Sequence, residues 1–239
     1  MNPEPPSIHA RRDRGHPGRI RLYAMGCALL MLPGALVAQA AGTEAANPFP
    51  LHPADAQIRM AVQSLPENLR EGVRVLGYQE VGGAPVTLQA GDGSFVCLLS
   101  PPGVWVVESA CYHESLEPFM ARGRELARQG ISGNERVAIR NQEAEDGTLP
   151  IPTEPAALYV TLAPAEGVDP GSGSFNDSFS RSVIYVPFAT GTTTGLSERP
   201  LPGSPWLMDP GTPRAHIMFS PSMELPPALQ RAQQRARQN

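Results

Sequence analysis

The first forty residues constrain this chain most, because they decide where it folds. A basic stretch is followed by an apolar run over residues 22–37 and then by the A-x-A pattern Ala38-Gln39-Ala40. This order is typical of a secretory signal peptide. We therefore expect cleavage after Ala40 and folding outside the cytoplasm, where disulfide bonds persist. The basic stretch contains Arg11, Arg12, Arg14, Arg19 and Arg21.

Three other interpretations of this leader are less favoured. An uncleaved membrane anchor needs about 20 consecutive apolar residues, and the run is broken by Gly26, Pro33 and Gly34. Lipoprotein processing at Cys27 would require the apolar run to precede this cysteine, but most of it follows. A twin-arginine signal at residues 11–12 is disfavoured because polar residues come next. We expect a periplasmic or secreted protein with no stable membrane span after cleavage.

The charge of the chain argues against a nucleic-acid partner. The formal net charge is −4, and all 19 basic residues are arginine. The leader holds more arginines than acids, so the mature chain is more acidic still. No basic stripe of the kind that phosphate backbones require is visible.

Two cysteines, Cys97 and Cys111, remain after cleavage. An even pair in an exported chain is best explained by one disulfide bond. For a closed loop of about 15 residues, the chain-entropy model gives a stabilisation of about 3 kcal/mol. Metal binding by the pair is the alternative, although no C-x-x-C spacing supports it.

The first half of the mature chain reads as one helix followed by an antiparallel meander. Apolar residues at helical spacing predict a helix over 54–65, which Pro66 ends. Gly82-Gly83 and Asp92-Gly93 are turn signals between β-rich runs, and the second is typical of a tight hairpin. Four neighbouring strands are expected, over residues 73–78, 86–88, 95–99 and 104–111.

Two helices are expected after the cysteine-bearing strands. An apolar stripe over residues 116–127 predicts the first, with Ser115 as its cap and Gly130 just past its end. The second starts at Ser132, which forms a capping-box pattern with Glu135, and ends before Gly147.

The second half is dominated by proline- and glycine-rich connections. Strands are expected over residues 157–162, 183–188 and 215–219, with Pro187 placing the middle one at a sheet edge or at its end. Residues 169–181 are expected to form a mobile loop, and residues 191–213 an irregular segment with Trp206 in an apolar island. The short helical pattern after Leu225 is expected to be frayed.

The fold class that follows is α+β, a single domain whose antiparallel sheet carries two helices and long Pro/Gly-rich loops. The expected organisation is a signal peptide (1–40), a flexible lead-in (41–53), the α+β domain (54–221) and an Arg-rich C-terminal tail (222–239).

Two junctions carry the candidate site residues. His113 precedes the first of the two helices, and His216 opens the last strand. If these junctions met, two imidazoles and a carboxylate could hold zinc or iron. Each residue also has a structural interpretation, as a hydrogen-bonded histidine or as an acid near a helix N-terminus. The candidate metal or ligand site is His113, Glu114, Glu117, Asp209 and His216.

Other catalytic patterns are missing from the sequence. There is no G-x-S-x-G elbow on a strand-to-helix turn, no lysine-bearing phosphate loop and no C-x-x-C-H haem site. Catalytic residues and cofactors are therefore not assigned.

Two runs of sequence resemble a group of exported bacterial proteins of unknown function. They are CYHESLEPFMARGREL at residues 111–126 and PWLMDPGTPRAHIM at residues 205–218. The likeness covers roughly residues 55–221. It implies a single exported domain, and it brings no activity, cofactor or catalytic residue.

The sequence thus favours a non-catalytic exported domain that binds a small molecule or an envelope component. The alternative is a metal-dependent enzyme that uses His113 and His216. A third possibility is a structural envelope protein recruited through its Arg-rich tail.

Overall fold

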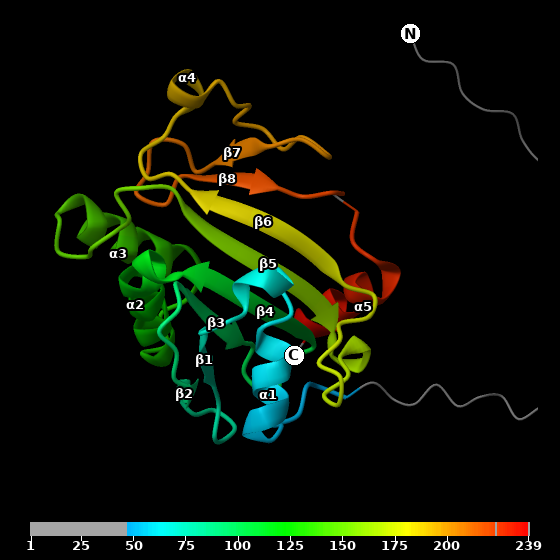
Figure 1. Cartoon of the computed structure of the whole chain (residues 1–239). Helices are drawn as coiled ribbons and strands as arrows, with labels where there is room; N and C mark the ends of the chain where they lie inside the picture. Colours follow the sequence, from blue (N-terminus) through cyan, green and yellow to red (C-terminus); the bar gives the residue numbers. More distant parts are fainter. Residues whose placement is uncertain (1–46, 223, 239) are drawn as a thin grey trace, which may run out of the picture. The chain divides into compact units, whose positions relative to one another are not determined.

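The computed structural model describes residues 47–222 and 224–238, and the predicted signal peptide lies outside them. Eight strands form one sheet in the order β2-β1-β3-β4-β5-β6-β8-β7 (Figure 1). The strands are β1 (Arg74–Gly77), β2 (Val86–Gln89), β3 (Phe95–Leu99), β4 (Val106–His113), β5 (Ala156–Pro164), β6 (Phe179–Tyr185), β7 (Trp206–Met208) and β8 (His216–Phe219).

Five α-helices and three short 3-10 helices occur in the described residues. They confirm the α+β class, but the expectation of two helices on an all-antiparallel sheet is wrong, because β1 and β3 pair in parallel. The α-helices are α1 (Ala54–Ala61), α2 (Glu117–Arg128), α3 (Gly133–Glu145), α4 (Gly191–Thr194) and α5 (Pro227–Ala236). The 3-10 helices are η1 (Glu67–Leu69), η2 (Glu114–Leu116) and η3 (Ala165–Gly167).

The parallel pair arises from the segment that was expected to be a hairpin turn. Neither Asp92 nor Gly93 has the positive φ that a tight hairpin turn needs. Instead the Gly93 amide donates to the carbonyl oxygen of Gly72 at 2.8 Å. A Cβ on Gly91 would collide with that same carbonyl. The glycines therefore let the chain cross the start of β1 at close range, which brings β3 to the far side of β1.

The sheet has two faces, which we name by the helices that cover them. On the α1 face, Val107 and Cys111 of β4 pack in one core cluster with residues of α1, including Met60. On the α2 face, Tyr112 packs with Leu116, which directly precedes α2. Side chains alternate along a strand, so neighbouring residues of β4 serve different cores.

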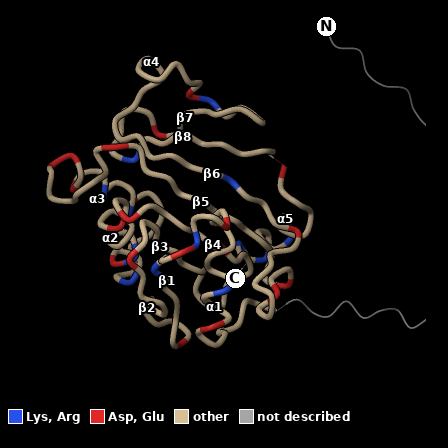
Figure 2. Tube along the Cα trace, in the orientation of Figure 1, with Lys and Arg blue, Asp and Glu red and all other residues tan. Residues whose placement is uncertain are grey.

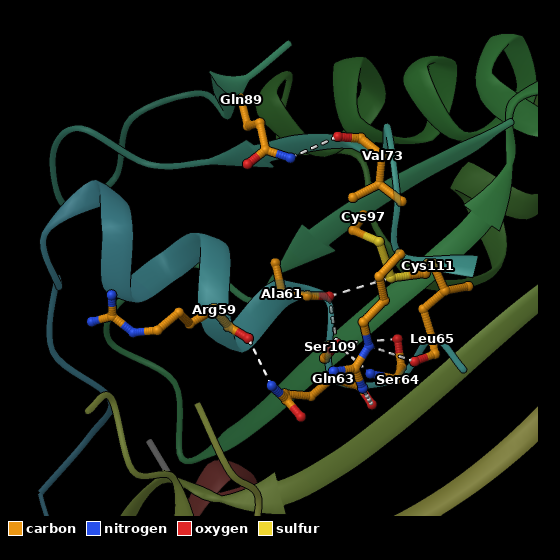
Figure 3. The surroundings of a disulfide bond; sticks show 11 residues. Arg59, Ala61, Gln63, Ser64, Leu65, Val73, Gln89, Cys97, Ser109 and Cys111 are labelled. Atoms are coloured by element: carbon orange, nitrogen blue, oxygen red, sulfur yellow. Dashed lines mark hydrogen bonds between the residues drawn. A yellow bond between two sulfur atoms is a disulfide. The ribbon is translucent and has the colours of Figure 1, made fainter. Parts of the chain in front are cut away.

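The predicted disulfide bond joins Cys97 and Cys111, which lie directly opposite each other on β3 and β4. Both cysteines are fully buried on the α1 face. Around them, the hydroxyl of Ser109 donates to the carbonyl oxygen of Ala61 at 2.8 Å (Figure 3). The Sγ atom of Cys111 contacts the same oxygen at 3.3 Å. The bond therefore lies directly beneath the end of α1.

Two expected helix caps differ from the structure. The Nδ1 atom of His113 accepts the amide N–H of Ser115, so His113, and not Ser115, caps the turn before α2. Ser132 makes no side-chain cap, because the following Gly133 has a φ of +54° and bends the first residue of α3 away from helical geometry. Gly130, with a φ of +82°, ends α2 as expected.

The connection over residues 169–181 is ordered and shorter than expected. β6 already begins at Phe179. Val168 and Phe175 pair with each other and pack against the core of the α1 face. The Asp169 carboxylate accepts the amide of Gly171 at 2.9 Å, which closes the turn.

Regular structure also occurs in the segment that was expected to be irregular. Trp206 is only 6% exposed and begins β7, and Thr190 caps the one-turn helix α4. Pro187 lies just past the end of β6, which pairs with β5 and β8 and is not an edge strand.

Both ends of the described chain pack on the sheet. Phe49 is 3% exposed, and its amide donates to Val104 at 2.7 Å, so this part of the expected flexible lead-in is held in place. α5 packs against β4 and β5 with Leu229 fully buried, which contradicts a frayed tail. None of the helices in the described part of the chain has the length and apolar character needed to cross a membrane.

Candidate functional site

The structure does not bring His113 and His216 together. His113 lies on the α1 face, two residues after Cys111. His216 lies on the α2 face, because the neighbouring Met218 belongs to the same cross-strand row as Tyr112. The two histidines are also three strands apart, about 14 Å at roughly 4.8 Å per strand. One metal ion cannot reach both imidazoles over that distance.

His113 has a structural role in its own surroundings. Its Nδ1 atom lies 2.8 Å from the Ser115 hydroxyl and caps the 3-10 turn. The edge of its ring meets Phe95, with centroids 5.9 Å apart. The same turn leaves Glu114 at the surface.

Glu117 is held in an ion-pair network. Its carboxylate accepts the Tyr112 hydroxyl at 2.5 Å and an Nη of Arg124 at 2.8 Å, and Arg74 lies 3.3 Å away. Burial raises the pKa of Tyr112, which therefore remains a hydrogen-bond donor. Glu117 is thus shared between two arginines and is not a free ligand.

A surface cavity of about 600 Å³ borders His113, Glu114 and Glu117. Two of its charged lining residues, Arg74 and Glu117, pair with each other. Within residues 47–222 and 224–238, no three His, Cys, Asp or Glu side chains gather in a way that could hold a metal ion.

A second cavity lies on the α2 face, over the strands β5, β6, β8 and β7. We call it the α2-face cavity. Its volume is about 270 Å³, room for roughly nine waters at about 30 Å³ each. It is lined by Leu158, Val160, Arg181, Val183, Tyr185, Met208, Arg214, His216 and Met218.

The floor of the α2-face cavity consists of three cross-strand rows. Rows two residues apart along a strand are separated by about 7 Å. The middle row is apolar, whereas one flanking row carries a cation and the other carries two rings. The rows are Val160–Arg181, then Leu158–Val183–Met218, then Tyr185–His216–Met208.

Arg181 is the one charged residue in the strands from β5 to β8 (Figure 2). Its Nε atom is buried and has no hydrogen-bond partner. No carboxylate of the described residues lies within ion-pair distance of it. Glu108 on β4 is coupled to Arg181 electrostatically, but burial raises the pKa of Glu108 and favours its neutral form. Arg181 therefore has no ion-pair partner at contact distance among the described residues.

Arg214, at the other end of the cavity, does have a partner. Its Nε atom lies 2.9 Å from the carboxylate of Asp209. Asp209 adopts a left-handed backbone with a φ of +53°, in the turn between β7 and β8. This turn points Asp209 back towards Arg214, so the pair is close to neutral.

His216 is positioned by Arg214 and Tyr185. Its Nδ1 atom lies 2.7 Å from the Arg214 carbonyl oxygen, which can only accept, so Nδ1 carries the hydrogen. Burial lowers the pKa of His216, which favours the neutral ring with a free electron pair on Nε2. The ring stacks on Tyr185, with centroids 5.2 Å apart.

Of the predicted site residues, only His216 lines this cavity, and Asp209 lies beside it through its ion pair with Arg214. The candidate site that the sequence predicted did not include Arg181, Tyr185 or Arg214. Arg181 was assigned to the glycine- and serine-rich loop 169–181, which hid its place in a strand. A signal was present, since one arginine stands among the small and apolar residues of β6.

Comparison with protein-family models, curated proteins and solved structures finds no match for this chain.

Proposed function

We propose that this chain is an exported, non-catalytic binding domain that takes a small molecule in the α2-face cavity. The leader pattern of the sequence, the buried Cys97–Cys111 bond and the lack of a membrane-spanning helix in the described residues are compatible with export.

The observation that carries this proposal is the composition of the cavity wall. Ligand sites are mostly apolar concavities with a few polar groups that orient the ligand. Here Leu158, Val183 and Met218 form the apolar part, and Arg181 and His216 provide polar groups at its two ends. All five side chains project from paired strands, so the site is formed before any ligand arrives.

The alternative of a metal-dependent enzyme that uses His113 and His216 gains no support. The two histidines face opposite sides of the sheet. His216 is the one histidine at the α2-face cavity, and the neighbouring Asp209 is occupied by Arg214.

A binding experiment with eight-carbon compounds tests the proposal. Trp206 lies in the same row as Val183 and Met218, so its fluorescence reports on the cavity floor. In a chain whose other tryptophan is replaced (Trp105→Phe), titration with octanoate or octanol should give a saturable change in Trp206 emission.

Two neighbouring substitutions provide the matched control. Val183→Phe fills the middle of the cavity and should abolish the fluorescence change. Ile184→Phe adds a similar ring on the opposite face, where Ile184 is 41% exposed, and should leave binding intact. No response to either compound, or equal loss in both variants, would contradict the proposal.

A further inference from the structure

The charge of the α2-face cavity narrows the class of ligand. Its nine lining residues include two arginines and no acid. Arg214 is matched by the adjacent Asp209 at 2.9 Å. Arg181 has no such partner among the described residues, although the chain as a whole is acidic. The cation without a contact ion pair is therefore at the Arg181 end, where Glu108, whose pKa is raised by burial, is the acid coupled to it.

The chemistry of Arg181 suits an oxyanion. A guanidinium group offers several N–H donors in one plane and pairs with carboxylates and phosphates through two parallel hydrogen bonds. Its Nε–H, buried without an acceptor, is one of the donors that such a pairing uses. A buried donor is costly to leave unpaired, so a ligand oxygen there would be strongly favoured.

The rows next to Arg181 define the rest of the ligand. Leu158, Val183 and Met218 follow at about 7 Å, and all are apolar. The stacked rings of Tyr185 and His216 come after them. A ligand anchored at Arg181 would lay an apolar body along this floor.

We propose that the ligand of the α2-face cavity is an amphiphilic organic anion, whose carboxylate or phosphate pairs with Arg181 while its apolar body lies on Leu158, Val183 and Met218. This inference rests on the proposed function, because it names the chemistry of the molecule bound at that site.

Three eight-carbon probes that differ in the head group test the inference on the unaltered cavity. Octanoate should bind at least about tenfold more tightly than octanol, the ratio expected for a charge-assisted hydrogen bond. Octylamine should bind more weakly than octanol, because Arg181 repels its ammonium group. The readout is the Trp206 emission described above, calibrated by titration calorimetry.

Substitution of Arg181 provides a second test of the inference. Arg181→Gln should reduce octanoate affinity about tenfold and leave octanol affinity unchanged, so that the two probes become equivalent. Arg199→Gln, at an exposed arginine outside the cavity, should change neither affinity. Thermal melting of each variant checks that it folds. If Arg181→Gln does not fold, the comparison of the three head groups on the unaltered chain still tests the inference.

The outcomes separate the two proposals. Equal affinity for octanoate and octanol, with both lost in Val183→Phe, overturns the anion inference and leaves the binding function standing. Octylamine binding as tightly as octanoate also overturns it. Absence of binding by all three probes rejects the cavity as a ligand site.

Discussion

Gln57 illustrates how a single buried amide joins separate parts of this fold. The side chain is 3% exposed. Its Nε2 donates to the carbonyl oxygens of His52 and Tyr78, both at 2.7 Å, and its Oε1 accepts the Tyr78 amide at 2.8 Å. It thereby connects the segment before α1, α1 itself and the residue that follows β1. The sequence pattern offered no sign of this role, since Gln57 is a polar residue outside the apolar positions that predicted this helix.

Gln57→Leu should lower the free energy of unfolding by about 2 kcal/mol or more, because it leaves buried backbone groups without partners. The measurement is urea unfolding followed by circular dichroism. Gln63→Leu is the control, since the side chain of Gln63 makes one hydrogen bond, to the Arg59 carbonyl. Equal stabilities of the two variants would show that the Gln57 hydrogen bonds contribute little.

His216 should make stability depend on pH. Burial lowers its pKa in the folded state, so the unfolded chain binds a proton more readily. The stabilisation from the neutral ring is therefore complete above the unfolded pKa of about 6.5 and is lost as the pH falls below it. The free energy of unfolding should decline from pH 7.5 to pH 5 more steeply in the parent chain than in His216→Gln.

Comparing the two chains at each pH cancels the contributions of other groups. Burial also lowers the pKa of His52 and raises that of Glu108, and both remain in His216→Gln. Parallel pH profiles for the two chains would mean that His216 is protonated equally in the folded and unfolded states.

At the scale of elements, the disulfide and α5 are the two attachments whose energies can be tested separately. The cysteines join β3 to β4 within the α1-face core. α5 holds the C-terminal segment against β4 and β5. The sequence was sufficient to predict the disulfide, because only one pairing exists when two cysteines remain. The sequence was insufficient to predict the packing of α5, because the apolar stripe of this helix is short and the surface that it contacts comes from distant strands.

Cys97→Ser should cost about 3 kcal/mol of unfolding free energy, the value for a closed loop of about 15 residues. Free-thiol labelling of the denatured mature chain (residues 41–239), which lacks Cys27, should be negative until reductant is added. Because both sulfurs are buried, reductant should act slowly on the folded protein and quickly in denaturant. Thiol labelling before reduction would contradict the bond.

Leu229→Ala should destabilise the protein by about 2–5 kcal/mol, the usual range for a fully buried leucine. Arg231→Ala, at an exposed position of the same helix, should change stability by less than about 0.5 kcal/mol. Both are measured by chemical unfolding. A negligible effect of Leu229→Ala would mean that α5 detaches readily in solution.

At the scale of the whole molecule, the proposed export and the proposed binding site are linked through the disulfide-bonded core. The disulfide joins β3 to β4, and β4 pairs with β5, the first strand of the α2-face cavity. Folding in a reducing compartment would remove that bond and weaken the support for the site.

Expression of the whole chain in a bacterial host should yield a processed protein that begins at Ala41 and is found in the periplasm or medium. Intact-mass measurement and N-terminal sequencing of each cell fraction provide the test. Recovery of the unprocessed chain in the cytosol, with reduced thiols, would reject the export proposal.

Sequence patterns predicted correctly those features that depend on interactions between residues close in the chain. The apolar stripe of α2, the left-handed Gly130 and the pairing of Cys97 with Cys111 all depend on residues close in sequence, and all agree with the structure. The hairpin expected at Asp92-Gly93 failed because a contact with Gly72, about twenty residues earlier, decided the path of the chain.

The cavity could be found only in three dimensions. Arg181 on β6 and the Arg214–His216 segment at the start of β8 are more than 30 residues apart, and the strand order from β5 to β7 brings them to one face. The same order places His113 on the opposite face, which no spacing in the sequence reveals. Side-chain direction follows strand register, and register is settled by long-range pairing and core packing rather than by neighbours along the chain.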